Sequence, residues 1–207
     1  MKEYQFIIKR GISDQNERQL ILNEDFIKFE NKDYIHDPFT IIQKEEITAY
    51  RYGIKWISYF GLDFQIYIQY SNNKQIKINF ATYFGRHKSK YLKLYRDIAY
   101  KMWDLYFQDI ANNYLQKFNE GIEFQIADVY FNQNGVFFKE GIINAKKIEI
   151  PWKNVRTFNY QSYFAIADSE KLDSVNKQIS YLEDWNVPVL HSVIRTILNY
   201  HGIESHE

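Results

Sequence analysis

The sequence predicts a mainly β protein with two helices, in the order strands, helix, strands, helix. Apolar residues recur every three or four positions, the period of one helix face, only near residues 90–118 and 187–200. Most of the remaining chain alternates apolar with polar residues, as half-buried strands do. Aromatic residues make up 18% of the 207 residues, and large rings pack well on the pleated face of a sheet.

Residue types at the ends of both apolar stripes support the two helices. Gly121 follows the first stripe, where a residue in the left-handed conformation commonly ends a helix. Pro188 suits the first turn of the second helix, and Asn186 before it can act as a cap. We therefore expect a long helix over about residues 90–118 and a shorter one over about residues 187–200.

Strands are expected wherever apolar and polar residues alternate between turn signals. Residues 71–74, Ser-Asn-Asn-Lys, predict a β-hairpin turn, and the pair Asn134-Gly135 predicts a second tight turn. The candidate strands before the long helix cover residues 4–9, 19–22, 26–30, 47–54, 64–70 and 76–80. Those after it cover residues 123–131, 135–139, 145–150, 154–160, 162–167 and 177–182.

The two halves of the chain align with each other, which predicts an internal duplication. Residues 22–29 match residues 131–138 at an offset of 109, and residues 42–52 match residues 150–160 at an offset of 108. Because the two offsets nearly agree, we expect one structural unit over residues 1–119 and a second over residues 120–207.

The second half carries the residues of a family resemblance. A hairpin over residues 129–139 precedes the step Ile150-Pro151-Trp152-x-x-Val155, and the final helix follows. This arrangement resembles the pleckstrin-homology-like (PH-like) domain in its bacterial form. The resemblance implies two tandem PH-like β-barrels, each closed by a C-terminal amphipathic helix. A fatty-acid-binding barrel or another small barrel is an open alternative.

Composition excludes several classes of function. The chain has 26 basic and 26 acidic side chains, so it lacks the net positive charge of a general nucleic-acid binder, and no nucleic acid is expected. It has no cysteine, which excludes disulfides, thiolate zinc sites and cysteine nucleophiles. No apolar stretch has the length of a signal peptide or a membrane span, so we expect a cytoplasmic protein.

Two groups of residues are candidates for binding. The first is a basic patch near residues 86–101, which suits an anionic lipid headgroup, a phosphate or an acidic partner, and which could instead dock the acidic second half. Its members are Arg86, Lys88, Lys90, Lys93 and Arg96. The second group is aromatic and forms either a partner surface or part of the core: Tyr50, Tyr52 and Trp56.

The hairpin loops and the motif search bear on the kind of function. PH-like domains that bind lipids usually carry basic residues around the first hairpin loop, whereas residues 23–25 and 132–134 are acidic or neutral here. The chain contains no phosphate-binding loop, dinucleotide fingerprint or nucleophile elbow, so no catalytic residue, cofactor or metal is expected.

We therefore expect a non-catalytic interaction or scaffold module that binds a protein or peptide, by strand addition at a sheet edge or in the groove beside a capping helix. Recognition of an anionic membrane is the alternative, and a small-ligand binder or enzyme with a barrel cavity is the third. The sequence also leaves open whether the chain forms a homo-oligomer.

Overall fold

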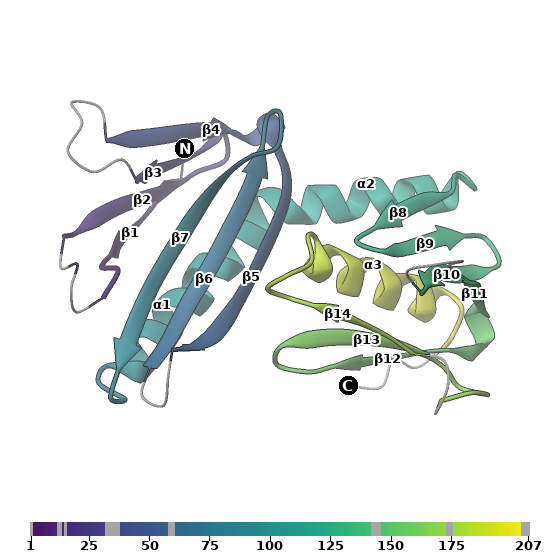
Figure 1. Ribbon diagram of the computed structural model, residues 1–207. Coiled ribbons are helices and arrows are strands. Elements are labelled where there is room, and N and C mark those ends of the chain that lie inside the picture. The colour runs from purple at the N-terminus through teal and green to yellow at the C-terminus, as the bar shows by residue number, and fades with distance from the viewer. Residues whose placement is uncertain are drawn as a thin grey trace. The chain divides into compact units, whose positions relative to one another are not determined.

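The structure is a computed structural model that describes residues 2–11, 14, 16–31, 38–57, 61–141, 146–172 and 176–203. Within this part of the chain there are four antiparallel β-sheets and a long helix near the middle of the sequence (Figure 1). The protein is therefore mainly β, as the sequence predicts. Its residues group into two compact units, Met1–Gln108 and Asp109–Glu207.

The first unit contains a four-stranded sheet, a three-stranded sheet and a helix. The four-stranded sheet has the order β1-β2-β3-β4, formed by β1 (Tyr4–Ile8), β2 (Arg18–Leu22), β3 (Phe26–Glu30) and β4 (Phe39–Gln43). A 3-10 turn, η1 (Lys44–Glu46), leads into the sheet of β5 (Ile47–Ile57), β6 (Gly61–Tyr70) and β7 (Lys74–Tyr83). Then come the helix α1 (Lys88–Met102) and a π-helical turn, η3 (Trp103–Phe107).

The second unit repeats this plan after the helix α2 (Gln108–Asn119). Its four-stranded sheet has the order β11-β10-β9-β8, formed by β8 (Phe124–Ile126), β9 (Val129–Asn132), β10 (Gly135–Glu140) and β11 (Lys146–Pro151). The 3-10 turn η4 (Trp152–Asn154) precedes the sheet of β12 (Val155–Asn159), β13 (Tyr163–Asp168) and β14 (Asn176–Ser180). The helix α3 (Val187–Tyr200) follows, over the residues that the sequence predicts.

The division between the units lies inside the long helix, whereas the sequence analysis places it after residue 119. The reason is the packing of α2. The rings of Tyr114 and Phe118 pack on Phe124 and Trp152, with centroids 5.2 and 5.6 Å apart. Because all four of these rings lie in the second unit, α2 contributes to that core.

The internal repeat is visible in the elements and in their hydrogen bonds. The segments that the sequence aligns fall on matching elements, β3 with β10 and η1 with η4. The first residues of the two 3-10 turns, Lys44 and Trp152, each donate a backbone N–H to the preceding hairpin turn. The acceptors are the carbonyl oxygens of Asp25, at 2.7 Å, and Asn134, at 3.1 Å. The same contact thus joins the same two elements in each unit.

Asn23 and Asn132 hold these hairpin turns in the same way. Each Oδ1 accepts hydrogen bonds from the backbone N–H groups two and three residues later, over distances of 2.9 to 3.1 Å. The backbone carbonyl of each asparagine accepts a further hydrogen bond from an aromatic side chain. The donors are the Tyr106 hydroxyl, at 2.8 Å, and the Trp152 indole Nε1, at 3.1 Å. Both turns are therefore fastened to the core of their own unit.

Two details of the strands differ from the sequence prediction. β4 is not predicted, because its Ile41 and Ile42 are adjacent and interrupt the alternation; in the structure Ile42 is buried and Ile41 is 51% exposed. The single strand expected over residues 123–131 is instead two strands, β8 and β9. The chain turns between them because Ala127 has a φ of 51°.

No closed barrel is present in the described part of the chain, since each unit has two separate sheets. In the first unit, η1 connects the two sheets at one side. Near β1 and β7, the backbone N–H of Ala81 donates a hydrogen bond to the carbonyl of Arg10 at 3.0 Å. The Tyr106 hydroxyl also bonds the carbonyl of Phe26 in β3 at 2.8 Å, so the helical segment contacts the four-stranded sheet as well.

A glycine substitution tests the hairpin contact between β10 and β11. A Cβ atom on Gly135 would lie 2.1 Å from the backbone oxygen of Ile150, so Gly135→Ala requires the strands to separate. We expect this variant to lose about 2 kcal/mol or more of unfolding free energy, measured by urea denaturation. The matched control is Gly11→Ala, whose Cβ would have its nearest neighbour at 3.5 Å. Equal stability of the two variants would contradict the assigned register.

Candidate functional site

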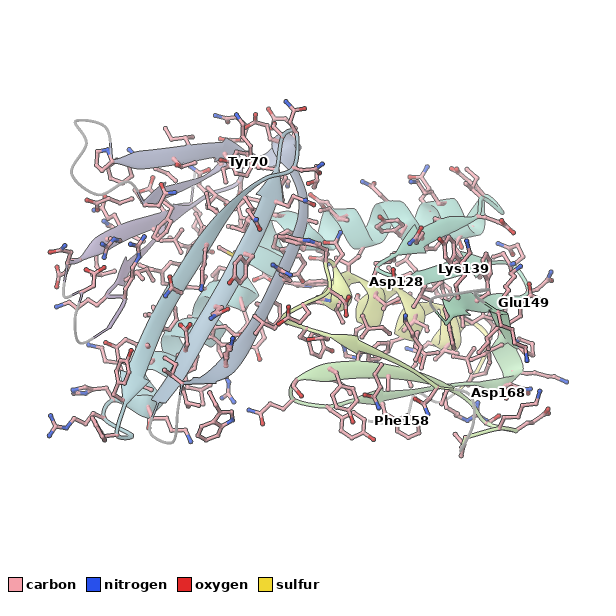
Figure 2. All side chains as sticks on the ribbon, viewed as in Figure 1. Tyr70, Asp128, Lys139, Glu149, Phe158 and Asp168 are labelled. Atoms are coloured by element: carbon pink, nitrogen blue, oxygen red, sulfur yellow. The ribbon has the colours of Figure 1, made fainter. Side chains whose placement is uncertain are left out.

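A hollow of about 400 Å³ opens at one end of the three-stranded sheet in the first unit. It lies at the opposite end of β6 from Tyr70, which is labelled in Figure 2. Its lining is mainly apolar and comes from β5, β6, β7 and the start of α1: Trp56, Gly61, Leu62, Thr82, Phe84, Gly85 and Lys88.

The floor of the hollow continues the core-facing side of the sheet. Cross-strand pairing places Trp56, Leu62 and Thr82 in one row across β5, β6 and β7. The neighbouring row on the same face contains Phe64 and Phe80, which are fully buried. The hollow therefore lies over the next row of the same apolar face, in which Trp56 is exposed and Leu62 half-buried, whereas Thr82 is buried.

The position of α1 explains why Trp56 in this row is exposed. Tyr91 stacks on Phe80 and Tyr95 packs against Phe64, with ring centroids 5.8 and 5.4 Å apart. The helix therefore covers the Phe64–Phe80 row. Its first residue, Lys88, stands at the edge of the hollow, so no turn of α1 remains to cover the next row.

The connection from β7 to α1 holds Phe84 in a strained backbone conformation. Phe84, Gly85 and His87 all have positive φ, at 54°, 69° and 58°. A left-handed conformation costs an aromatic residue of order 1 kcal/mol or more, and such strain persists only when surrounding contacts impose it. Here the Thr82 hydroxyl donates a hydrogen bond to the backbone oxygen of Arg86. The Phe84 ring remains 68% exposed beside the hollow.

Positive charge dominates this part of the molecule. Only two acidic residues, Asp63 and Asp97, occur between residues 47 and 103. The same segment contains ten basic residues: Arg51, Lys55, Lys74, Lys77, Arg86, Lys88, Lys90, Lys93, Arg96 and Lys101. The first turn of α1 has no acidic residue, and its backbone N–H groups add partial positive charge. Basic residues therefore outnumber acidic ones in this segment, and one of them, Lys88, lies at the edge of the hollow.

The structure separates the predicted basic patch into two parts. All five of its predicted members are exposed, but only Lys88 lines the hollow, with Arg86 in the connection just before it. Lys90, Lys93 and Arg96 continue along the exposed side of α1, and Lys93 is 4.0 Å from Asp97. The patch is thus a strip that begins at the hollow and follows the helix.

The predicted aromatic surface is wrong for two of its three members. Tyr50 is 1% exposed and stacks on Phe107 with the ring centroids 3.4 Å apart. Tyr52 packs against Tyr95 at 5.9 Å, and burial raises the pKa of Tyr52 to about 12. Tyr50 belongs to the core and Tyr52 is half-buried, because α1 and η3 pack on this part of the face. Trp56 lies on the same face of β5 and is 71% exposed, since it extends into the uncovered row.

Sequence reasoning did not identify Phe84, Leu62 or Thr82 as site residues. The strand pattern places Leu62 and Thr82 on the apolar face, but it cannot show where a helix distant in sequence begins to cover that face. Phe84 has a weak signal, an aromatic residue directly before glycine and a run of cations.

The start of the helix is covered in the described part of the second unit. Val187, Val189 and Leu190, in the first turn of α3, are completely buried, whereas Lys88, Ser89 and Lys90 are exposed at the start of α1. The two units therefore differ in how the first turn of the helix is buried.

The described residues include no group of three His, Asp or Glu side chains that could hold a metal ion. No helix among them is long and apolar enough to cross a membrane. No protein-family model matches the chain, and no curated protein matches it.

Two truncations test whether the Trp56 row is uncovered. Trp56→Ala should change the unfolding free energy of the first unit by less than about 0.5 kcal/mol, because the ring is mostly in solvent. Phe64→Ala, in the adjacent buried row, should cost about 3 to 5 kcal/mol. Urea denaturation of both variants gives the comparison. A large loss in Trp56→Ala would show that the ring is packed.

Proposed function

We propose that this chain is a non-catalytic binding module built from two PH-like units, and that the hollow of the first unit binds a protein segment. That segment would place an apolar side chain between Trp56 and Phe84 and would carry acidic residues toward Lys88. The observation that carries the proposal is the open apolar row, flanked by two exposed rings and bordered by cations.

The order of elements supports the PH-like assignment. Among the residues that the structure describes, each unit has seven antiparallel strands, divided four and three, followed by a helix. This agrees with the resemblance that the sequence shows in the step from Ile150 to Val155. The same 3-10 turn between the two sheets occurs in both units, which supports a common origin for them.

The hollow suits a peptide side chain for two physical reasons. The floor of the hollow belongs to the same apolar face as the core. An apolar group that binds there removes apolar surface from water, and each Å² removed contributes about 25 cal/mol to the binding free energy. Trp, Tyr and Arg are the side chains that most often dominate binding energy at protein interfaces, and Trp56 lines the hollow while Arg86 lies in the connection beside it. The cations select for acidic neighbours and exclude basic ones.

Binding to an anionic membrane uses some of the same chemistry, because aromatic rings and lysines both favour the bilayer interface. Two observations favour the peptide. The hairpin turn at Glu24 and Asp25 is acidic, and the hollow is an indentation of about 400 Å³ rather than a flat apolar surface. We therefore treat membrane binding as an outcome of the test.

A peptide titration tests the proposal. The probe is the blocked peptide Ac-Glu-Glu-Leu-Glu-Glu-amide, followed by amide chemical shifts in the ¹⁵N-labelled protein. We expect saturable shifts confined to the neighbourhood of Leu62, Thr82 and Phe84. Replacing the probe leucine with serine, or all its glutamates with lysines, should weaken binding at least about tenfold, because either change removes one of the two recognised features.

Variants and vesicles complete this test. Lys88→Glu should weaken the probe at least about tenfold by charge repulsion, whereas Lys153→Glu, the same change in the second unit, should leave it unaltered. Shifts scattered over the surface would contradict the proposal. So would a failure to bind the probe together with salt-sensitive binding to phosphatidylcholine vesicles that contain phosphatidylserine, which would assign the hollow to membranes instead.

A further inference from the structure

We infer that the hollow binds the turn over residues 119–123 of a second copy of this chain. The inference rests on the proposed function and names the partner of the same site. Three observations carry it: an exposed apolar side chain on that turn, the carboxylates on both sides of it, and the opposite charge of the two units.

The turn presents one aliphatic side chain between two acids. Ile122 is 48% exposed, and its neighbours Glu120 and Glu123 are exposed as well. The sequence around it, Glu-Gly-Ile-Glu, is thus an apolar group with flanking negative charge. This is the pattern that the apolar floor and the cations of the hollow would select.

Local hydrogen bonds fix the shape of this turn. It ends α2, and Gly121 adopts a φ of 73°. The N–H of Gly121 donates to the carbonyl of Phe118 at 3.0 Å, and the N–H of Ile122 donates to the carbonyl of Lys117 at 2.9 Å. Because the backbone is already ordered, little conformational entropy is lost when the turn enters a hollow.

The two carboxylates are also held in place. The Glu120 Oε1 accepts a hydrogen bond from the Gln116 side chain at 2.8 Å, and the Glu123 Oε1 accepts one from the Asn132 side chain at 3.4 Å. A carboxylate keeps further lone pairs when it accepts one such bond. Each can therefore still pair with a cation such as Lys88 of another copy.

The charges of the units are complementary. Residues 1–108 contain 17 Lys and Arg against 13 Asp and Glu, whereas residues 109–207 contain 9 against 13. The net charge of the whole chain is zero because the first unit carries a net charge of +4 and the second a net charge of −4. Two copies attract each other when the first unit of one meets the second unit of the other, and salt weakens this attraction.

The contact joins two different surfaces, the hollow of one copy and the turn of another. After one such contact forms, each of the two copies still has one of its two surfaces available. Such a heterologous contact either closes into a ring or continues into a chain of copies. One side chain in one hollow buries little area, which predicts a weak association that depends on concentration.

Complementation between two damaged copies tests this inference. Lys88→Glu disables the hollow and Ile122→Ser disables the turn, and both changes are at exposed positions. By sedimentation velocity at low salt, we expect the wild type to associate and each variant alone to remain monomeric. An equimolar mixture should form dimers through the one intact pair of surfaces and nothing larger. Lys153→Glu should associate like the wild type, and high salt should weaken every association.

The outcomes separate this inference from the proposed function. Wild type that stays monomeric up to about 1 mM overturns the inference, because even weak contacts associate at that concentration. If the acidic leucine peptide still binds, the proposed function survives and the partner is another protein. Association that persists in both variants also overturns the inference, since it must use other surfaces. Circular dichroism of each variant establishes that it is folded.

Discussion

The packing of α1 on the sheet of β5, β6 and β7 determines which side chains of the first unit are buried and which line its hollow. The helix covers the row of Phe64 and Phe80 and does not extend over the next row, where Trp56 is 71% exposed and Leu62 is half-buried, while Thr82 is buried. One surface of the sheet is therefore core over most of its length and lines a hollow at its end. Tyr50 and Trp56 point to the same face of β5. Tyr50 is buried because the helical segment packs on it, whereas Trp56 lies beyond the start of α1 and is exposed.

The two units show how a repeated fold can be used in two ways. Each fastens its hairpin turn with an asparagine, Asn23 or Asn132, and each begins its last helix after a residue with positive φ, His87 or Asn186. Beyond that point the helices differ. α3 begins with apolar residues that are completely buried, whereas α1 begins with lysines. The second unit is therefore closed where the first is open, and the basic helix start coincides with the opening.

Sequence patterns predict most of this fold because local periodicity reflects burial. The apolar stripe at residues 187–200 and the turn at residues 71–74 match α3 and the β6–β7 turn, where Asn72 and Asn73 both have positive φ. The site could be predicted only in part. Lys88 and Trp56 are recognisable from the sequence by charge and size. The sequence does not show that Lys88 and Trp56 line the hollow while Lys93 and Tyr50 do not. That distinction depends on which residues of the sheet α1 covers, and a contact between segments distant in sequence leaves no local pattern.

The accessibility of Leu62 tests the central claim most directly, and the chain is suited to it because it contains no cysteine. Single cysteines at Leu62, on the floor of the hollow, and at Ile78, fully buried under the helix, can be compared by their rates of reaction with a small thiol reagent. The account predicts that Leu62→Cys, at a half-buried position that lines the hollow, reacts directly in the native state. Ile78→Cys should react only through unfolding, orders of magnitude more slowly. Equal protection of the two thiols would show that the row is covered and would contradict the account.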